Sequence, residues 1–431
     1  MLPRNVILIF IFLAAAQLCP AHSALLFQQG DPPPRTIREK IDSIKRPGPA
    51  FDLCLTDSLG CSELTPVFLE TGDSLSGFTN FINSVGSFFQ IDTAKKRRIT
   101  FLALPEFSYS DNNGFGLGFT ARMYINDYSP RPAGFIKRQS YVDLSGNFTF
   151  KGNLSVSINP TLYLMSDRLL IRGRFSLGRY PSTFRAIGAN TSDDQKEDYD
   201  KSSTMFRLIT YWRWFKNVYI GIGGHYYDYG VSNTVEGGML EESNIAGSKG
   251  AKISGLSLHY LYDSRDNQFV PMKGFYTQIE GYFNGKFMGS TEDYTKYIID
   301  VRYYQPVAKD QIIAMNFYSQ ISVGDVPFQD MALLSNGVYG RGYGTGRYID
   351  KNLMSLQAEY RYYFGRFGVS AFASTSNVGD TPLKALKIDK FTYGAGVRFK
   401  PFRGQRMYFR ADMGFNTHGD VQVYLGIDEL F

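Results

Sequence analysis

Two short motifs contain residue types that could perform chemistry. Residues 72–75 read Gly-Asp-Ser-Leu, a pattern typical of lipases whose serine attacks an ester carbonyl. Such a serine needs a histidine to take its proton, and the chain lacks the later Asp-x-x-His of these enzymes. Residues 340–346 alternate glycine with other residues, as some phosphate-binding loops do, but no strand–helix unit surrounds them. Neither motif predicts an active site.

Metal, cofactor and nucleic-acid chemistry have little support in the sequence. The histidines, at positions 22, 225, 259 and 418, show no spacing typical of a metal site, and we expect no cofactor. The net charge is +6, and acidic and basic residues alternate along the chain. The densest basic run, residues 95–98, directly precedes the first alternating segment. This position favours a solvated or membrane-facing edge, and we expect no nucleic-acid partner.

Charged residues recur on one face of segments whose hydrophobicity has a period of two. In residues 117–125, Leu, Phe, Ala, Met and Ile alternate with polar or small residues, and residues 141–150 and 354–362 behave alike. The polar faces of these and later segments carry Arg122, Asp143, Glu359, Arg361, Arg398, Arg410 and Asp412. Charges on one face, with Phe, Tyr, Val and Met on the other, are typical of a barrel wall between lipid and a wet lumen.

These elements predict an all-β fold, an antiparallel transmembrane β-barrel after a short non-barrel N-terminal segment. No stretch is apolar enough for a transmembrane helix, and in lipid only helices and closed barrels satisfy the backbone. The 30 Tyr, 35 Phe and 43 Gly agree with aromatic girdles and tight turns. Residues 98–431 allow about 16 strands at roughly 20 residues for a strand and its connection. We expect long loops at 183–203, 230–251 and 324–350, and short turns at 365–368 and 401–404.

The start of the chain reads as a targeting segment. Residues 1–23 predict a signal peptide, because a positive start and an apolar core precede Ala-His-Ser. Cys19 leaves a lipoprotein signal open, although Leu18 stands where that signal has a small residue. Cleavage after residue 23 would direct the mature chain out of the cytoplasm, to the outer membrane if the barrel prediction holds.

Residues 24–97 differ in composition from the barrel and are expected in the periplasm. They are rich in proline and contain one amphipathic stretch, residues 76–91, that could form a helix or a plug. Cys54 and Cys61 predict a small disulfide loop in an oxidising compartment, and two free thiols are the alternative.

In the last segment, residues 421–431, apolar and more polar residues alternate, and the segment ends in Phe431. A terminal aromatic on such a strand looks like the signal that hands bacterial barrels to their insertion machinery. We therefore expect that machinery as a partner during biogenesis and the outer-membrane bilayer as the permanent partner.

Two later segments carry ordered motifs. Residues 258–275 contain Asp-x-Arg-Asp-x-x-x-x-Pro-x-x-Gly, formed by Asp263, Arg265, Asp266, Pro271 and Gly274. Residues 336–361 contain Arg-Gly-Tyr, formed by Arg341, Gly342 and Tyr343, and end in Glu-Tyr-Arg. Together the two segments resemble the BamA/TamA superfamily, whose barrel is also called bacterial surface antigen. The resemblance covers about residues 98–431.

The resemblance implies a 16-stranded barrel with a weak seam between its first and last strands. It also implies that a loop folds into the lumen and that its arginine, here Arg341, docks on the wall. Glu359 faces inward by the alternation and is the first candidate partner, with Arg361 beside it. The family often places an aspartate two residues after a phenylalanine on the next strand. Here Ser374 stands two residues after Phe372, so the carboxylate that would receive the loop arginine is missing at this position.

The resemblance leaves the activity open. Assembly factors of this family carry periplasmic POTRA domains, but residues 24–97 are barely long enough for one and lack its strands. The leading hypothesis is a non-enzymatic barrel that assists insertion or translocation of barrel or secreted-protein clients, or remodels the membrane at its seam. A channel, or a structural barrel that anchors an outer-membrane complex, is the alternative. An enzyme with a Ser and a His that meet on the outer wall of the barrel is the third hypothesis.

Overall fold

The computed structural model describes residues 99–110, 114–125, 138–149, 152–192, 194–242, 245–335, 338–387, 389–400 and 407–431. The chain divides into two units, Met1–Asp73 and Ser74–Phe431, and every described residue belongs to the second. The predicted signal peptide, Cys19, Cys54, Cys61 and the turn at 401–404 lie outside the described residues. Their assignments remain predictions.

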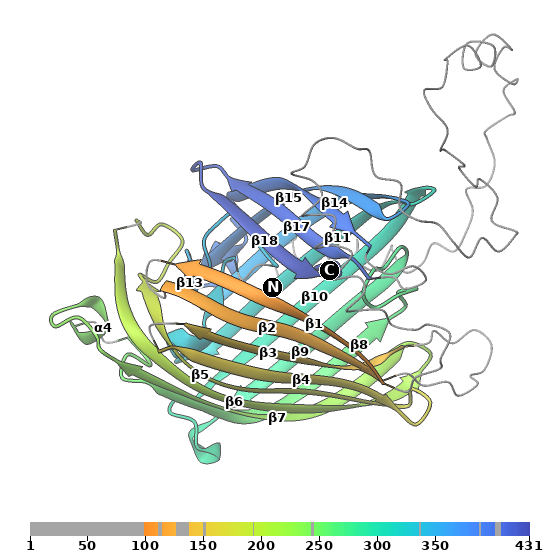
Figure 1. Ribbon diagram of the computed structural model, residues 1–431. Helices are drawn as coiled ribbons and strands as arrows, with labels where there is room; N and C mark the ends of the chain where they lie inside the picture. Colours follow the sequence, from red (N-terminus) through yellow and green to blue (C-terminus); the bar gives the residue numbers. More distant parts are fainter. Residues whose placement is uncertain are drawn as a thin grey trace, which may run out of the picture. The chain divides into compact units, whose positions relative to one another are not determined.

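A single antiparallel sheet of sixteen strands forms the wall of the described part. Its strands are β1 (Ile99–Ser110), β2 (Gly114–Ile125), β3 (Ser140–Thr149), β4 (Leu154–Leu164), β5 (Leu169–Arg185), β6 (Lys196–Phe215), β7 (Val218–Ser232), β8 (Ala251–Asp263), β9 (Gly274–Asn284), β10 (Tyr294–Ala308), β11 (Gln311–Gly324), β14 (Asn352–Phe364), β15 (Phe367–Gly379), β16 (Lys390–Phe399), β17 (Phe409–Asn416) and β18 (Val421–Ile427). Each strand pairs with its neighbours in the chain. Figure 1 shows them following one another around a curved sheet, with orange β1 and blue β18 at its edges.

The period of two explains why the sheet has a polar inner face and an apolar outer face. On β14, Leu356 and Tyr360 are 49% and 40% exposed, whereas Gln357, Glu359 and Arg361 between and after them are buried. On β18, the outward Val423 and Leu425 are exposed. Apolar side chains directed outward and charged ones directed inward agree with lipid outside the wall. The predicted all-β antiparallel transmembrane barrel is therefore confirmed.

Consecutive hairpins place their connections at opposite ends of the wall. We call one end the turn rim; among the described residues it holds 138–139, 165–168, 216–217, 264–273, 309–310, 365–366, 400, 407–408 and 428–431. We call the other the loop rim; among the described residues it holds 152–153, 186–192, 194–195, 233–242, 245–250, 285–293, 325–335, 338–351, 380–387, 389 and 417–420. The loop predicted at 183–203 is shorter than expected, because β5 and β6 stay paired out to Arg185 and Lys196.

The remaining elements are short and lie at the loop rim. They are α4 (Met239–Glu242), α5 (Pro382–Ala385), the 3-10 turns η1 (Lys286–Met288) and η2 (Phe328–Asp330), and the pair β12 (Ala332–Leu333) and β13 (Ile349–Asp350). None of the helices in the described ranges is long and apolar enough to cross a membrane.

Candidate functional site

Arg341, at the tip of the loop 325–351, is buried against the inner wall with 1% of its surface exposed. Its Nη2 donates to Glu359 Oε2 at 2.6 Å, and its Nη1 donates to Asp412 Oδ2 at 2.9 Å. The guanidinium lies 3.6 Å from the centre of the Phe372 ring. Two carboxylates and an aromatic face compensate the charge of a planar cation that would otherwise be costly to bury.

The sheet register builds the surface on which this arginine rests. Glu359 on β14 is opposite Phe372 on β15, and Phe372 is opposite Gly394 on β16. Gly394 is in turn opposite Gly414 on β17, so these four residues form one row across the wall. A Cβ at Gly394 would meet the Phe372 ring, and one at Gly414 would lie 2.9 Å from the Arg341 carbonyl carbon. The two glycines therefore leave the space that the ring and the loop backbone occupy.

Gly342 allows the loop to approach the wall by its backbone. Its φ is +127°, which side-chain-bearing residues rarely adopt, and a Cβ there would lie 2.6 Å from Phe415 O. Its N–H donates to Tyr424 Oη on β18 at 3.0 Å, and its carbonyl accepts from Asn416 Nδ2 at 3.2 Å. The loop tip is thus hydrogen-bonded to β17 and β18 as well as salt-bridged to β14 and β17.

A buried ionic network continues from Arg341 toward the turn rim. It joins Arg341, Arg361, Arg398 and Arg410 to Glu359, Asp412 and Glu429. Arg398 is central, because its Nη2 lies 2.8 Å from Glu359 Oε1 and its Nη1 lies 2.5 Å from Asp412 Oδ1. Each carboxylate contacts more than one guanidinium, so loss of one carboxylate would leave several buried cations undercompensated.

The segment after β18 closes this network. Phe431 is 2% exposed, and its main-chain oxygen accepts from Arg361 Nη2 at 3.0 Å. The Arg361 guanidinium lies 5.1 Å from the centre of the Phe431 ring. Phe431 therefore has a packing role in the folded wall, and its role as an insertion signal remains a prediction.

The first motif shapes the β8–β9 turn, residues 264–273. Asp263 accepts from Arg265 Nε at 2.9 Å and Nη2 at 3.0 Å, and Asp266 Oδ1 accepts from the backbone of Met272 and Lys273. Burial alone would lower the pKa of Arg265, but the charge of Asp263 outweighs burial and holds that pKa above its usual range. Gly274 has a φ of +118°, and a Cβ there would lie 2.6 Å from Ser264 O. Pro271 lies within this turn.

A second group of contacts ties this turn to other connections of the turn rim. Arg138 Nη1 donates to Asp167 Oδ2 and to Tyr219 Oη, both at 2.8 Å, and Arg138 also donates to the carbonyl of Asp263. Arg213 Nη1 lies 3.1 Å from Asp167 Oδ2. Asp263 and Arg265 of the motif thus belong to a buried cluster of ion pairs at the turn rim, far in sequence from the docked loop.

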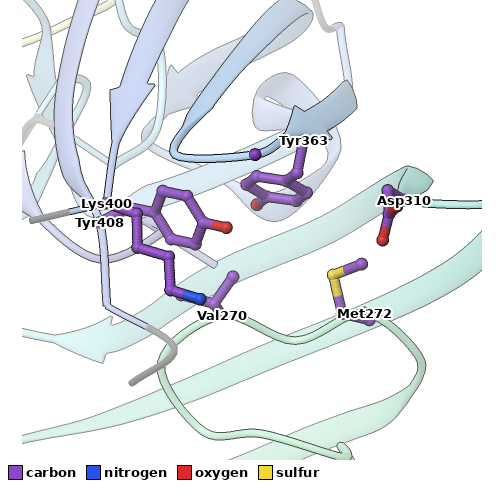
Figure 2. A pocket seen from close by; sticks show the side chains of 7 residues that line it. Val270, Met272, Asp310, Tyr363, Lys400 and Tyr408 are labelled. Atoms are coloured by element: carbon purple, nitrogen blue, oxygen red, sulfur yellow. The ribbon is translucent and has the colours of Figure 1, made fainter. Parts of the chain in front are cut away.

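A pocket of about 240 Å³ lies beside the β8–β9 turn. It is lined by Val270, Met272, Asp310, Tyr363, Gly365, Lys400 and Tyr408. Figure 2 shows the Tyr408 and Lys400 side chains on one side of it and Met272 and Asp310 on the other. In the described ranges, no group of three or more His, Cys, Asp or Glu side chains could hold a metal ion.

Comparison with known proteins decides the family. The model of the Omp85 superfamily domain matches residues 103–407, which is more than half of the chain. The chain belongs to the Omp85 superfamily. The predicted BamA/TamA resemblance is thereby confirmed, and the protein is an outer-membrane β-barrel of this superfamily.

Solved structures similar to this Omp85 chain share its fold. BamA from Haemophilus ducreyi lacking POTRA domains 1–3 is 12% identical, with a TM-score of 0.51 over 82% of this chain and 78% of that chain. CdiB from Escherichia coli is 12% identical, with a TM-score of 0.50 over 77% of this chain and 63% of that chain. The chain thus spans less than two thirds of CdiB, and at this identity the likeness shows the fold alone. No curated protein matches the chain by sequence.

The second carboxylate that binds Arg341 does not come from the position of Ser374, where the resemblance implied an aspartate, but from Asp412. The Ser374 hydroxyl forms a hydrogen bond within the wall, with its Oγ 2.6 Å from Thr392 Oγ1 on β16. Asp412, one strand further along, binds Arg341 instead. Tyr343 is 1% exposed and packs edge-on against Tyr348 at 5.6 Å. Sequence reasoning placed Asp412 on the polar face but missed it as a partner, because only the register brings β17 beneath the loop tip.

Proposed function

We propose that this Omp85 barrel assists the insertion or translocation of client proteins at the seam between β1 and β18, without enzymatic chemistry. The observation that carries the proposal is that the sheet order begins at β1 and ends at β18, and in the described residues these two strands do not pair with each other. An unpaired strand edge offers backbone donors and acceptors to an incoming strand. The clients would be barrel or secreted proteins, and lipid at the seam would be the second partner.

The unequal lengths of the edge strands support a weak seam. β1 has 12 residues and β18 has only 7. Even full pairing with β18 would therefore leave part of β1 without a partner. A short or poorly paired edge also disturbs nearby lipid, which lowers the barrier to insertion.

The occupied lumen argues against a wide channel as the main activity. The loop 325–351 enters from the loop rim and docks through Arg341, and the β8–β9 turn occupies the turn rim. Val270 of that turn is 1% exposed and packs with Tyr304, Tyr363 and Phe431. Passage along the lumen would require both elements to move.

One row of hydrogen-bonded side chains is connected like a hydrolase active site, but a substrate could not reach it. Ser257 Oγ lies 2.8 Å from His259 Nε2, and His259 Nδ1 lies 3.2 Å from Glu280 Oε1. Ser257 is 1% exposed, and a Cβ on the facing Gly223 would lie 2.7 Å from its Oγ. A nucleophile needs an open side for the substrate and for oxyanion donors, so this row of side chains fits a structural role better.

The test is quantitative mass spectrometry of the outer membrane after deletion of the gene in its native host. Loss of a defined subset of barrels or secreted proteins, with unchanged transcripts, is the expected result. Complementation with the wild-type gene should restore them, whereas Arg341→Ala should restore them only in part. An unchanged outer-membrane proteome would overturn the proposal and leave the channel and the structural anchor as the functions to examine.

A further inference from the structure

The β8–β9 turn contacts the β3 side of the seam through one side-chain amide. Gln268 Nε2 donates to the carbonyl of Gln139 at 2.8 Å, and Gln139 N–H donates to Gln268 Oε1 at 3.2 Å. Gln139 directly precedes β3. The amide thus forms a pair of hydrogen bonds with the backbone, similar to the pairing of a neighbouring strand.

The next residue of the turn contacts both sides of the seam. The Phe269 carbonyl accepts from the N–H of Glu429, which follows β18, at 3.2 Å. The Phe269 ring packs edge-on against Tyr124 of β2 at 5.7 Å and lies 5.3 Å from Tyr141 of β3. Two adjacent residues, 268 and 269, therefore link the first strands of the sheet to its last.

Arg122 of β2 strengthens this link. Its Nη1 lies 2.5 Å from Asp428 Oδ2, beyond β18, and its Nε lies 2.5 Å from Asp143 Oδ1 of β3. The guanidinium lies 5.1 Å from the centre of the Phe269 ring. The strands on either side of the seam are thus joined by an ion pair that the turn covers.

The base of the turn is held by two arginines, and its tip borders a pocket. Arg138 and Arg265 both bind Asp263, which fixes the residue where β8 becomes the turn. Val270 and Met272 line the pocket of Figure 2, so the tip has room on one side. A fixed base and an unfilled volume beside the tip are the geometry of a strap that can release its contacts without unfolding the wall.

We propose that the β8–β9 turn is an internal strap that holds the turn-rim end of the seam closed, so that the seam opens first at the loop rim. Gln268 and Phe269 are its positioning residues, and Arg122 with Asp428 is the ion pair that it protects. This inference rests on the proposed function only for the role of the opened seam, which is to admit client proteins. The docked loop complements the strap, because its tip contacts β14, β15, β17 and β18.

The test measures distances across the seam in the full chain, with the native cysteines replaced by serine and reconstituted in lipid nanodiscs. Spin labels at Phe101 and Leu425, both outward and near the turn rim, report that end. Labels at Leu117 and Val421, also outward, report the loop-rim end. Pulsed electron–electron double resonance then gives the open and closed populations at each end separately.

The decisive variant is the double change Gln268→Ala and Phe269→Ala. We expect the open-to-closed ratio of the turn-rim pair to rise about tenfold, because two hydrogen bonds and the ring contacts with Tyr124, Tyr141 and Arg122 are lost. The matched control, Gln195→Ala with Phe287→Ala, removes the same side chains at the loop rim and should leave the turn-rim distances unchanged. Gln268→Ala alone, which removes the two amide hydrogen bonds and keeps the Phe269 ring, should shift the ratio in the same direction by less and serves if the double variant does not fold.

The outcomes separate the strap from the proposed function. An unchanged turn-rim distance in a folded variant, shown by its compact mobility in unheated SDS gels, would overturn the strap, as would equal widening in the control. A parallel assay follows insertion of an unfolded barrel client into proteoliposomes. If the wild-type protein does not accelerate insertion, the proposed function fails while the distances still decide the strap.

Discussion

Two elements fill the lumen of this barrel from opposite rims, and they are held in different ways. The loop 325–351 is held mainly by charge, through Arg341 and the buried carboxylates of Glu359 and Asp412. The tip of the β8–β9 turn is held by an amide, a backbone carbonyl and an aromatic ring, through Gln268 and Phe269. The loop tip binds one side of the seam, whereas the turn tip binds both.

Because they are held by different kinds of contact, the two elements should control different properties. Breaking the charge network should lower the stability of the last strands, because buried arginines then lose their carboxylates. Breaking the strap should change the seam with a smaller loss of stability, because no buried charge is orphaned. The predictions below test this division, beginning with the largest expected effect.

Glu359→Gln should be the most damaging single change. It leaves Arg341, Arg361 and Arg398 without a carboxylate that all three contact, and the residue is 1% exposed. We expect the free energy of unfolding in urea, measured by tryptophan fluorescence in lipid, to fall by about 3–5 kcal/mol. Glu236→Gln, at an exposed loop-rim glutamate, is the control and should have no effect. A loss below about 1 kcal/mol would show that charge does not hold the loop side.

The strap side should instead show a dependence on pH through Asp428. Burial raises the pKa of Asp428 to about 6, and the neighbouring Glu429 adds to this shift while Arg122 opposes it. Arg410 also faces this residue, because its Nε donates to the Asp428 carbonyl. Since the folded pKa lies above the ordinary value, the neutral carboxyl stabilises the fold fully below about pH 4. That contribution is lost as pH rises through about 6.

The measurement is the free energy of unfolding in lipid at pH 4, 5, 6 and 7. We expect Asp428 to contribute a decrease of about 2–3 kcal/mol across this range and a plateau above it. Asp428→Asn, which stays neutral, should remove this component, and Asp380→Asn at an exposed residue should not. Identical pH profiles for wild type and Asp428→Asn would contradict the assignment.

Arg341→Ala should cost less stability than Glu359→Gln. Its removal leaves three arginines, Arg361, Arg398 and Arg410, with three carboxylates, Glu359, Asp412 and Glu429. We expect a loss of about 2 kcal/mol in the same urea titration, together with faster proteolysis of the released loop. A loss larger than that of Glu359→Gln would show that the arginine, and not the shared carboxylate, is the centre of the network.

The smallest predicted effect concerns the row of glycines beneath the loop. A methyl group at Gly414 would lie 2.9 Å from the Arg341 backbone, whereas one at Gly344 would meet nothing within 4 Å. Gly414→Ala should therefore displace the loop at a cost of about 1–2 kcal/mol, and Gly344→Ala should have little effect. Hydrogen exchange of residues 339–345 measures the displacement. Equal exchange in both variants would argue that the loop adapts without leaving the wall.

Much of the site could be predicted locally. Glu359 and Arg361 follow from the period of two on one strand, and Arg341 follows from its motif. Asp412 could be assigned to the inner face but not to the arginine, because its partner lies 71 residues away and only the register of β14–β17 brings them together. The strap could not be predicted at all, since no local pattern says that Gln268 will meet Gln139 across 129 residues of chain.

Sequence alone determined the wall of this protein: alternating side chains specify strands, and strands with one apolar and one charged face specify a barrel in lipid. What fills the lumen and what holds the seam depend instead on contacts between residues far apart in the sequence. The physical reason is that strand alternation is a property of neighbouring residues. The docking of Arg341 and the tethering by Phe269 depend on which distant strands the curvature and register of the sheet place opposite each element.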